Sequence, residues 1–134
     1  MTVLELLEAH PRSTVLNRAL LVRCIEECID CSATCTSCAD ADLAEPDVQE
    51  LLRCMRLCLD CADTCHATGR ILIRQTETDL GVSRTAIEAC LFACRVCAEE
   101  CEQHAAHHVH CRICAEVCRR CERACQDLLA AIPA

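Results

Sequence analysis

Apolar positions recur at steps of three and four residues along most of the chain, the spacing of one face of an α-helix. In four stretches the residue at these positions is cysteine. Leucine continues the same face beyond them, as at Leu16 and Leu20 before the first stretch and Leu72 after the second. Polar and charged side chains fill the positions between. The pattern predicts amphipathic helices whose buried faces meet in a shared core.

The four cysteine runs contain all 18 cysteines of the chain. Because residues three and four apart lie on one side of a helix, each run places thiols where a helical bundle usually has leucine. We call these 18 side chains the thiol core: Cys24, Cys28, Cys31, Cys35 and Cys38; Cys54, Cys58, Cys61 and Cys65; Cys90, Cys94, Cys97 and Cys101; Cys111, Cys114, Cys118, Cys121 and Cys125.

Breaks in the pattern predict an all-α fold, an antiparallel four-helix bundle with a short N-terminal helix, in one domain of residues 1–134. Pro46 and Gly81 mark two of the links, and Ser83 or Thr85 is expected to cap the helix after the second. The expected helices are a short one at about residues 3–10 and long ones at about residues 13–43, 46–75, 83–105 and 108–132.

The cysteines are offset along their helices. They lie toward the C-terminal half of the first and third long helices and toward the N-terminal half of the second and fourth. Since an antiparallel bundle alternates helix direction, all four runs should lie toward one end of it. We call the six residues expected to fill the opposite end the apolar end: Leu16, Leu20, Leu72, Ile87, Leu128 and Ile132.

Composition and charge exclude several classes of protein. Phe92 is the one aromatic residue, which argues against a sheet-rich fold. The net charge of −8 argues against nucleic-acid binding. No apolar stretch is long enough to span a membrane, and the N-terminus does not have the pattern of a secretory signal. We therefore expect a cytoplasmic protein, in which thiols stay reduced and dense cysteine indicates metal binding.

The spacing of the cysteines discriminates among the chemistries open to thiols. An inert core of 18 small side chains would bury little apolar surface. Disulfides within one run need helix distortion, because neighbouring Cβ vectors are roughly parallel. Zinc knuckles and iron–sulfur motifs use different spacings. Cu(I) is soft, prefers thiolate and accepts two or three ligands, so bridging thiolates predict several Cu(I) ions, roughly one per cysteine and on the order of 18 per chain.

Histidines cluster at the predicted third link, the end at which the thiol core lies. His104 and His108 continue the cysteine rhythm and are expected to bind ions entering or leaving the core. His110 is a further candidate ligand. The pattern leaves open the roles of His66, His107, Met55 and Asp42.

This pattern resembles the bacterial copper storage proteins, over essentially the whole chain. The spacing C-x3-C-x2-C-x3-C carries the resemblance, together with His104, His108 and His110; the spacing occurs four times, in Cys24–Cys35, Cys54–Cys65, Cys90–Cys101 and Cys114–Cys125. The N-terminus is similar to that of the cytosolic branch. The resemblance implies Cu(I) stored inside a four-helix bundle, in a homotetramer.

The function predicted from these observations is cytosolic storage and detoxification of Cu(I), without enzymatic activity. Copper ions are the expected partners, delivered by a copper chaperone or a small-thiol donor. Two alternatives remain at this point: a thiol redox buffer or sensor, and a zinc or cadmium sink.

Overall fold

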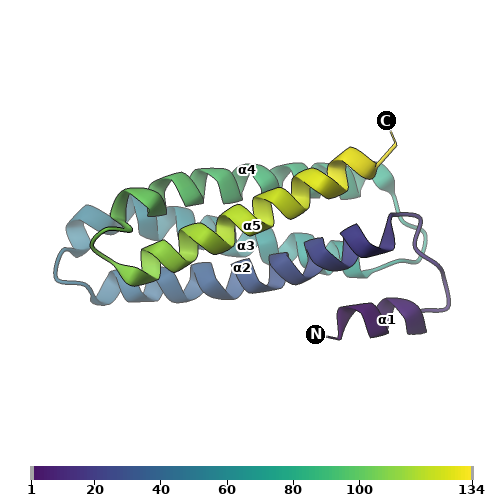
Figure 1. Ribbon diagram of the computed structural model, residues 1–134, viewed down its shortest axis with the longest axis horizontal. Helices are drawn as coiled ribbons and strands as arrows, with labels where there is room; N and C mark the ends of the chain where they lie inside the picture. The colour runs from purple at the N-terminus through teal and green to yellow at the C-terminus, as the bar shows by residue number, and fades with distance from the viewer. Residues whose placement is uncertain (1, 134) are drawn as a thin grey trace.

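The computed structural model describes residues 2–133, and this part of the chain contains helices and no strands, which confirms the all-α prediction. Four long helices lie side by side, and the 3-10 helix η1 precedes the second of them (Figure 1). The elements are α1 (Val3–Ala9), α2 (Arg18–Ala44), η1 (Val48–Leu51), α3 (Leu52–Ile73), α4 (Leu80–His104) and α5 (Val109–Ala131).

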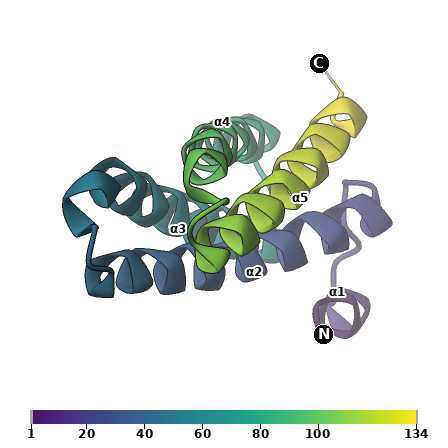
Figure 2. The same ribbon diagram turned by 60° about the vertical axis from the view of Figure 1, so that its left-hand side comes forward.

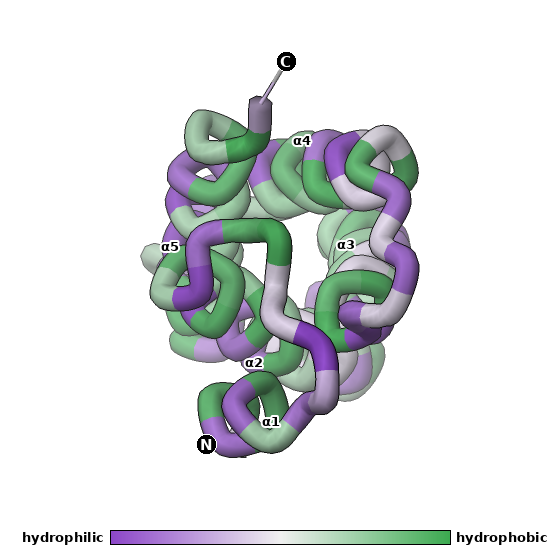
Figure 3. The backbone as a smooth tube through the Cα atoms, turned by 90° about the vertical axis from the view of Figure 1, so that its right-hand side faces the viewer, coloured by the Kyte–Doolittle hydropathy of each residue, from purple (hydrophilic) through white to green (hydrophobic). Residues whose placement is uncertain are grey.

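The four long helices form an antiparallel bundle. Contacts run from α2 to α3, α3 to α4, α4 to α5 and α5 back to α2, so each helix packs against two neighbours. The view along the bundle shows this ring order (Figure 3). The α2–α3 and α4–α5 links lie at one end, and the α3–α4 link lies at the other with the C-terminus (Figure 1). The topology therefore brings all four cysteine runs toward the first end.

The second long helix of the chain begins differently from the prediction. Pro46 lies in a turn, which is followed by the 3-10 helix η1 at Val48–Leu51, and the α-helix proper starts at Leu52. The first long helix starts at Arg18 instead of about residue 13, because the side chain of Asn17 accepts the backbone N–H of Leu20 at 3.0 Å. An asparagine in this role satisfies one of the unpaired N–H groups of a first helical turn.

Helix α4 starts at Leu80, earlier in the chain than predicted, because Asp79 caps it. Its Oδ1 accepts the backbone N–H of Val82 at 2.9 Å, so Asp79 is the N-cap and the expectation for Ser83 or Thr85 was wrong. The hydroxyl of Thr85 instead donates to the carbonyl of Gly81, one turn earlier in the same helix. Aspartate is among the most favourable N-cap residues, because its short side chain can accept an otherwise unpaired N–H of the first turn.

The core has the two expected parts. Every cysteine is at most 2% exposed, and five of the six apolar-end residues are buried, with Leu20 partly buried against them. Small buried residues such as Ala62 and Ala98 lie beside the cysteines and let the helices approach closely. Met55, whose role was left open, packs against this core from outside.

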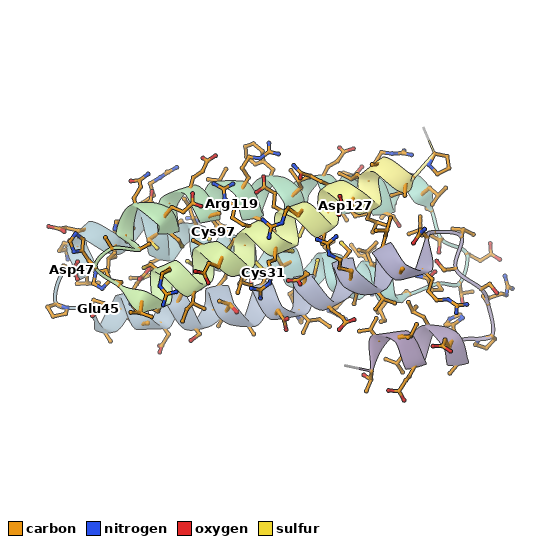
Figure 4. The ribbon with its side chains drawn as sticks, viewed as in Figure 1. Cys31, Glu45, Asp47, Cys97, Arg119 and Asp127 are labelled. Carbon is orange, nitrogen blue, oxygen red and sulfur yellow. The ribbon has the colours of Figure 1, made fainter. Side chains whose placement is uncertain are left out.

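Ion pairs join neighbouring helices on the surface of the bundle. Arg23 on α2 donates to Asp127 on α5 at 2.6 Å, and Arg119 on α5 contacts Glu102 on α4 at 2.8 Å. Arg119 and Asp127 both lie along α5, away from the buried thiols (Figure 4). Such exposed pairs contribute little individually, so burial of the core is the main source of stability.

The short helix α1 lies outside the ring of four. It packs on α2 through its buried Val3 and Leu7, and Thr2 caps it without a side-chain hydrogen bond (Figure 2). Among the described residues, no helix is both long and apolar enough to cross a membrane.

Candidate metal centre

The long helices position the thiols by periodicity alone. Within one helix, Cys31 Sγ lies 3.8 Å from Cys35 Sγ, one turn away. Between helices, Cys35 Sγ lies 3.6 Å from Cys114 Sγ on α5, and Cys65 Sγ lies 3.5 Å from Cys90 Sγ on α4. The sulfurs therefore contact one another both along each helix and between neighbouring helices.

Sulfur also spans the bundle diagonally. Cys31 Sγ on α2 lies 3.9 Å from Cys94 Sγ on α4, and Cys58 Sγ on α3 lies 3.9 Å from Cys114 Sγ on α5. Diagonal contact at this distance leaves no room for another side chain between the helices. Cys31 and Cys97 lie inside the bundle, whereas Glu45 lies at its end (Figure 4).

Groups of four thiols have the separations that a shared metal ion needs. In each group all four sulfurs lie within 4.8 Å of one another. Some cysteines belong to two groups, so neighbouring groups share ligands. Five of the groups are Cys28, Cys90, Cys121 and Cys125; Cys31, Cys65, Cys94 and Cys121; Cys31, Cys35, Cys61 and Cys118; Cys35, Cys97, Cys114 and Cys118; and Cys38, Cys54, Cys58 and Cys101.

The thiols are free, and none forms a disulfide. The pKa values of Cys28 and Cys65 lie well above the ordinary thiol value, because hydrogen bonds to Cys121 favour the neutral form and burial adds to the effect. A buried thiolate without a counter-ion would be costly in free energy. The hydrogen bond with Cys125 instead lowers the pKa of Cys24 to about 5, so the thiols do not all titrate alike. Because burial penalises the charged form, we expect most thiols of the metal-free core to be neutral.

His110 is the histidine that the structure brings to the thiols. Its Nδ1 lies 3.4 Å from Cys38 Sγ and 3.6 Å from Cys111 Sγ. Its Nε2 lies 3.0 Å from Glu45 Oε2. Because a carboxylate only accepts hydrogen bonds, Nε2 carries a proton, and Nδ1 is the ring nitrogen that faces the two sulfurs.

His104 and His108 lie at the same end but pair with carboxylates. His104 Nε2 contacts Glu100 Oε2 at 2.7 Å. His108 Nδ1 contacts Glu45 Oε2 at 2.5 Å, and its Nε2 contacts Asp47 Oδ2 at 2.9 Å. The hydrogen bond to Asp47 raises the pKa of His108 and so favours its doubly protonated form. In this state neither nitrogen of His108 has a lone pair for a metal ion.

Asp42 is the buried acid of this end. The residue is 0% exposed, and its Oδ1 accepts a hydrogen bond from Cys111 Sγ at 3.6 Å. Burial raises the pKa of Asp42 to about 7, and the nearby Cys54 thiol adds to the effect. Its second oxygen, Oδ2, has no hydrogen-bond partner among residues 2–133.

The structure thus separates the three predicted histidine ligands. It brings His110 to the thiols and places His104 and His108 among acids, whereas exposed His66 and His107 lie on the surface. Sequence reasoning missed Glu45, Asp47 and Glu100 as histidine partners. Glu45 and Asp47 flank Pro46 in a link predicted to lie at the histidine end, and their charge could have identified them.

The comparisons with known proteins agree with this arrangement. The family model described as "Copper storage protein" matches residues 17–130. No curated protein matches the chain. Among solved structures, that of Ccsp from Streptomyces lividans loaded with 10 copper equivalents is 49% identical, with a TM-score of 0.95. The match covers 97% of this chain and 99% of that one.

Two further structures of the Streptomyces lividans protein are similar. One, described as a cytosolic copper storage protein loaded with five coppers, is 50% identical over 86% of this chain and 96% of its own, with a TM-score of 0.85. The other, a variant with two histidines replaced by alanine, is 49% identical over 87% of this chain and 98% of its own, with a TM-score of 0.86. The likeness extends over all four long helices.

Proposed function

The chain belongs to the copper storage protein family, and from this premise we propose that it stores many Cu(I) ions in its thiol core, within the cytosol, and thereby detoxifies copper. The observation that carries the proposal is the continuous set of 18 free, buried thiols. Two copper-loaded structures of one relative, the Streptomyces lividans protein, support it at 49% and 50% identity. The 18 cysteines are the proposed ligands.

Sharing of thiols between groups favours Cu(I) over zinc or cadmium. Cys31, Cys35 and Cys121 each belong to two of the four-thiol groups. A divalent ion in a tetrahedral site needs four ligands. Two groups that share a cysteine therefore cannot each hold such an ion with four thiolates of their own. Cu(I) accepts two or three thiolates, and each thiolate can bridge two ions. Bridging allows roughly one ion per cysteine, on the order of 18 per chain.

The net charge that a bound metal ion leaves in the thiol core also favours Cu(I). Each Cu(I) that displaces one thiol proton leaves the buried core uncharged. A divalent ion bound by four thiolates leaves a net charge of −2 in the same space, and no arginine or lysine side chain is among the buried residues that the structure describes. An uncompensated buried charge is costly, so the core should take monovalent soft ions in bulk.

Burial argues against the redox alternative. Redox-sensing cysteines are accessible and have low pKa values. Here every thiol is at most 2% exposed. Peroxide would have to enter a packed core to react. A storage role uses the same burial, because it protects bound Cu(I) from oxidants.

Further parts of the proposal rest on the family. We infer that the chain is one storage domain without enzymatic activity and assembles as a homotetramer, loaded by a copper chaperone or a small-thiol donor. His104, His108 and His110 are proposed to bind ions passing the end of the core. Light scattering on the purified protein tests the tetramer, and a monomer at micromolar concentration would contradict it.

Titration tests the storage function. Reduced, metal-free protein is titrated with Cu(I) in the presence of a competing chelator, and bound copper is counted per chain. We expect saturation at more than ten ions, approaching one per cysteine. Saturation at one or two ions would overturn storage, and reversible disulfide formation by mild peroxide would favour the redox alternative.

A further inference from the structure

Four donor atoms of mixed chemistry converge at the histidine end of the core. Cys38 and Asp42 come from α2, one turn apart, and His110 and Cys111 come from the start of α5. His110 Nδ1 lies 3.4 Å from Cys38 Sγ, 3.6 Å from Cys111 Sγ and 3.7 Å from Asp42 Oδ1. Cys111 Sγ lies 3.6 Å from Asp42 Oδ1. This set differs from the all-sulfur groups deeper in the bundle.

Storage of Cu(I) does not explain why the carboxylate of Asp42 lies among these donors. Cu(I) is soft and selects thiolate, whereas carboxylate oxygen suits harder cations. Asp42 is nevertheless 0% exposed, and its Oδ2 has no hydrogen-bond partner among the described residues. A buried oxygen without a partner destabilises the fold, so such a group needs an explanation. The other oxygen, Oδ1, faces His110 Nδ1 and Cys111 Sγ, and a cation bound there would offset the cost of burying this carboxylate.

Glu45 orients the ring of His110 as a metal ligand. Its Oε2 accepts the Nε2 proton of His110 at 3.0 Å, which leaves Nδ1 free as a ligand. Carboxylate–histidine–metal arrangements of this kind are usual in zinc sites. A groove of about 300 Å³, lined in part by Ser37, Cys38, His110 and Ile113, opens onto the site from the surface. An ion can therefore reach Cys38 and His110 from this groove, and Asp42 and Cys111 lie directly behind His110.

We propose that Cys38, Asp42, His110 and Cys111 bind one divalent cation of the zinc class, in a site of two sulfurs, one nitrogen and one oxygen. Binding displaces the protons of the two thiols, and of Asp42 where it is protonated, and involves no electron transfer. The site goes beyond the storage function and needs no copper. Because it uses two cysteines at the end of the core, a bound divalent ion should also slow the entry of Cu(I).

The site is tested with Zn(II) alone on reduced, metal-free protein. At one equivalent, X-ray absorption at the zinc edge should show two sulfurs at about 2.3 Å and two nitrogen or oxygen ligands at about 2.0–2.2 Å. Competition with a chelator gives the affinity. Asp42→Asn should weaken Zn(II) binding at least about tenfold and leave Cu(I) capacity unchanged. Asp40→Asn, at an exposed position of the same helix, is the matched control and should change neither.

Two results would overturn the proposal. One is a zinc environment of four sulfurs in the wild-type protein, which would place the ion in the thiol core. The other is unchanged Zn(II) affinity in Asp42→Asn. The wild-type spectrum decides the matter even if that variant does not fold. Failure of Cu(I) titration with a retained zinc site would contradict storage alone, so the two proposals fail separately.

Discussion

The three histidines at the end of the core differ in the partners of their ring nitrogens. His110 has one nitrogen on Glu45 and the other beside two thiols. His104 and His108 contact carboxylates, and a metal ion can bind them only if these contacts break. Their side chains are 20% and 11% exposed, so they border the surface. At the scale of single residues, we infer a role in the passage of ions for these two and in binding for His110.

Replacing both His104 and His108 with alanine should therefore change the rate of Cu(I) uptake or removal more than the capacity. Stopped-flow mixing with a Cu(I)–chelator complex measures the rate, and equilibrium titration measures the capacity. His66→Ala, an exposed position on α3, is the control and should match the wild type. A capacity reduced by half would show that the pair does more than admit ions.

At the scale of elements, Glu122 on α5 forms an ion pair with α4. Its Oε2 accepts from Arg95 Nε at 2.8 Å and its Oε1 accepts from Arg119 at 3.0 Å. Burial by itself would raise the pKa of Glu122, but the hydrogen bonds from the two arginines outweigh it and lower the pKa below 4.5. The ionised form is therefore more stable in the folded state than in the unfolded chain.

A carboxyl group whose pKa is lower in the folded protein than in the unfolded chain stabilises the fold at pH values above its unfolded pKa. This stabilisation is lost as the pH falls through the pKa of the folded state. Glu122→Gln should lower the free energy of unfolding by about 1 kcal/mol at pH 7, because an amide accepts more weakly from arginine. The difference from wild type should fade below about pH 4. Urea unfolding of metal-free protein at both pH values measures it, and a pH-independent difference would contradict the ion-pair explanation.

Gly69 lies inside α3, yet the helix continues to Ile73. A Cβ at this position would meet Cys28 Cβ at 3.5 Å, an ordinary van der Waals distance. Gly69→Ala should therefore stabilise the metal-free protein by about 0.5–1 kcal/mol, because alanine is the better helix former. Thermal unfolding followed by circular dichroism tests this, and a lower midpoint would mean that the glycine is needed for close packing of α2 on α3.

At the scale of the whole molecule, storage should leave the net charge unchanged. The chain carries −8 at pH 7, and each Cu(I) should replace one thiol proton. We expect about one proton released per copper bound and the same electrophoretic mobility for metal-free and loaded protein. Proton release measured with a pH indicator, together with native electrophoresis, checks both. A mobility toward the anode that falls steadily with loading would mean that thiolates are already charged before copper arrives.

The apolar end should keep the metal-free bundle folded. Leu72, Ile87 and Leu128 are at most 2% exposed and pack at the end without cysteines. Burial of each such side chain contributes about 1.5–3 kcal/mol. Far-ultraviolet circular dichroism of reduced protein with a chelator should show a helical protein. A disordered chain that folds only with copper would contradict this and would resemble zinc fingers.

The sequence by itself determined the helices, the shared end of the cysteine runs and the chemistry of the core. These follow from local periodicity and from residue types, which do not depend on distant partners. Helix starts were less predictable, because Asn17 and Asp79 compete with other cap candidates nearby. Even so, the antiparallel order followed from short links and from the need to bury one face of each helix.

Only the tertiary structure decided which side chains meet at the end of the core. The rhythm of the sequence favoured His104 and His108 over His110, yet the fold brings His110 to the thiols. Glu45 and Asp42 reach it from α2 and its link, more than sixty positions earlier in the chain. Periodicity describes one helix at a time, whereas these contacts depend on how two links and two helix ends are positioned against each other in space.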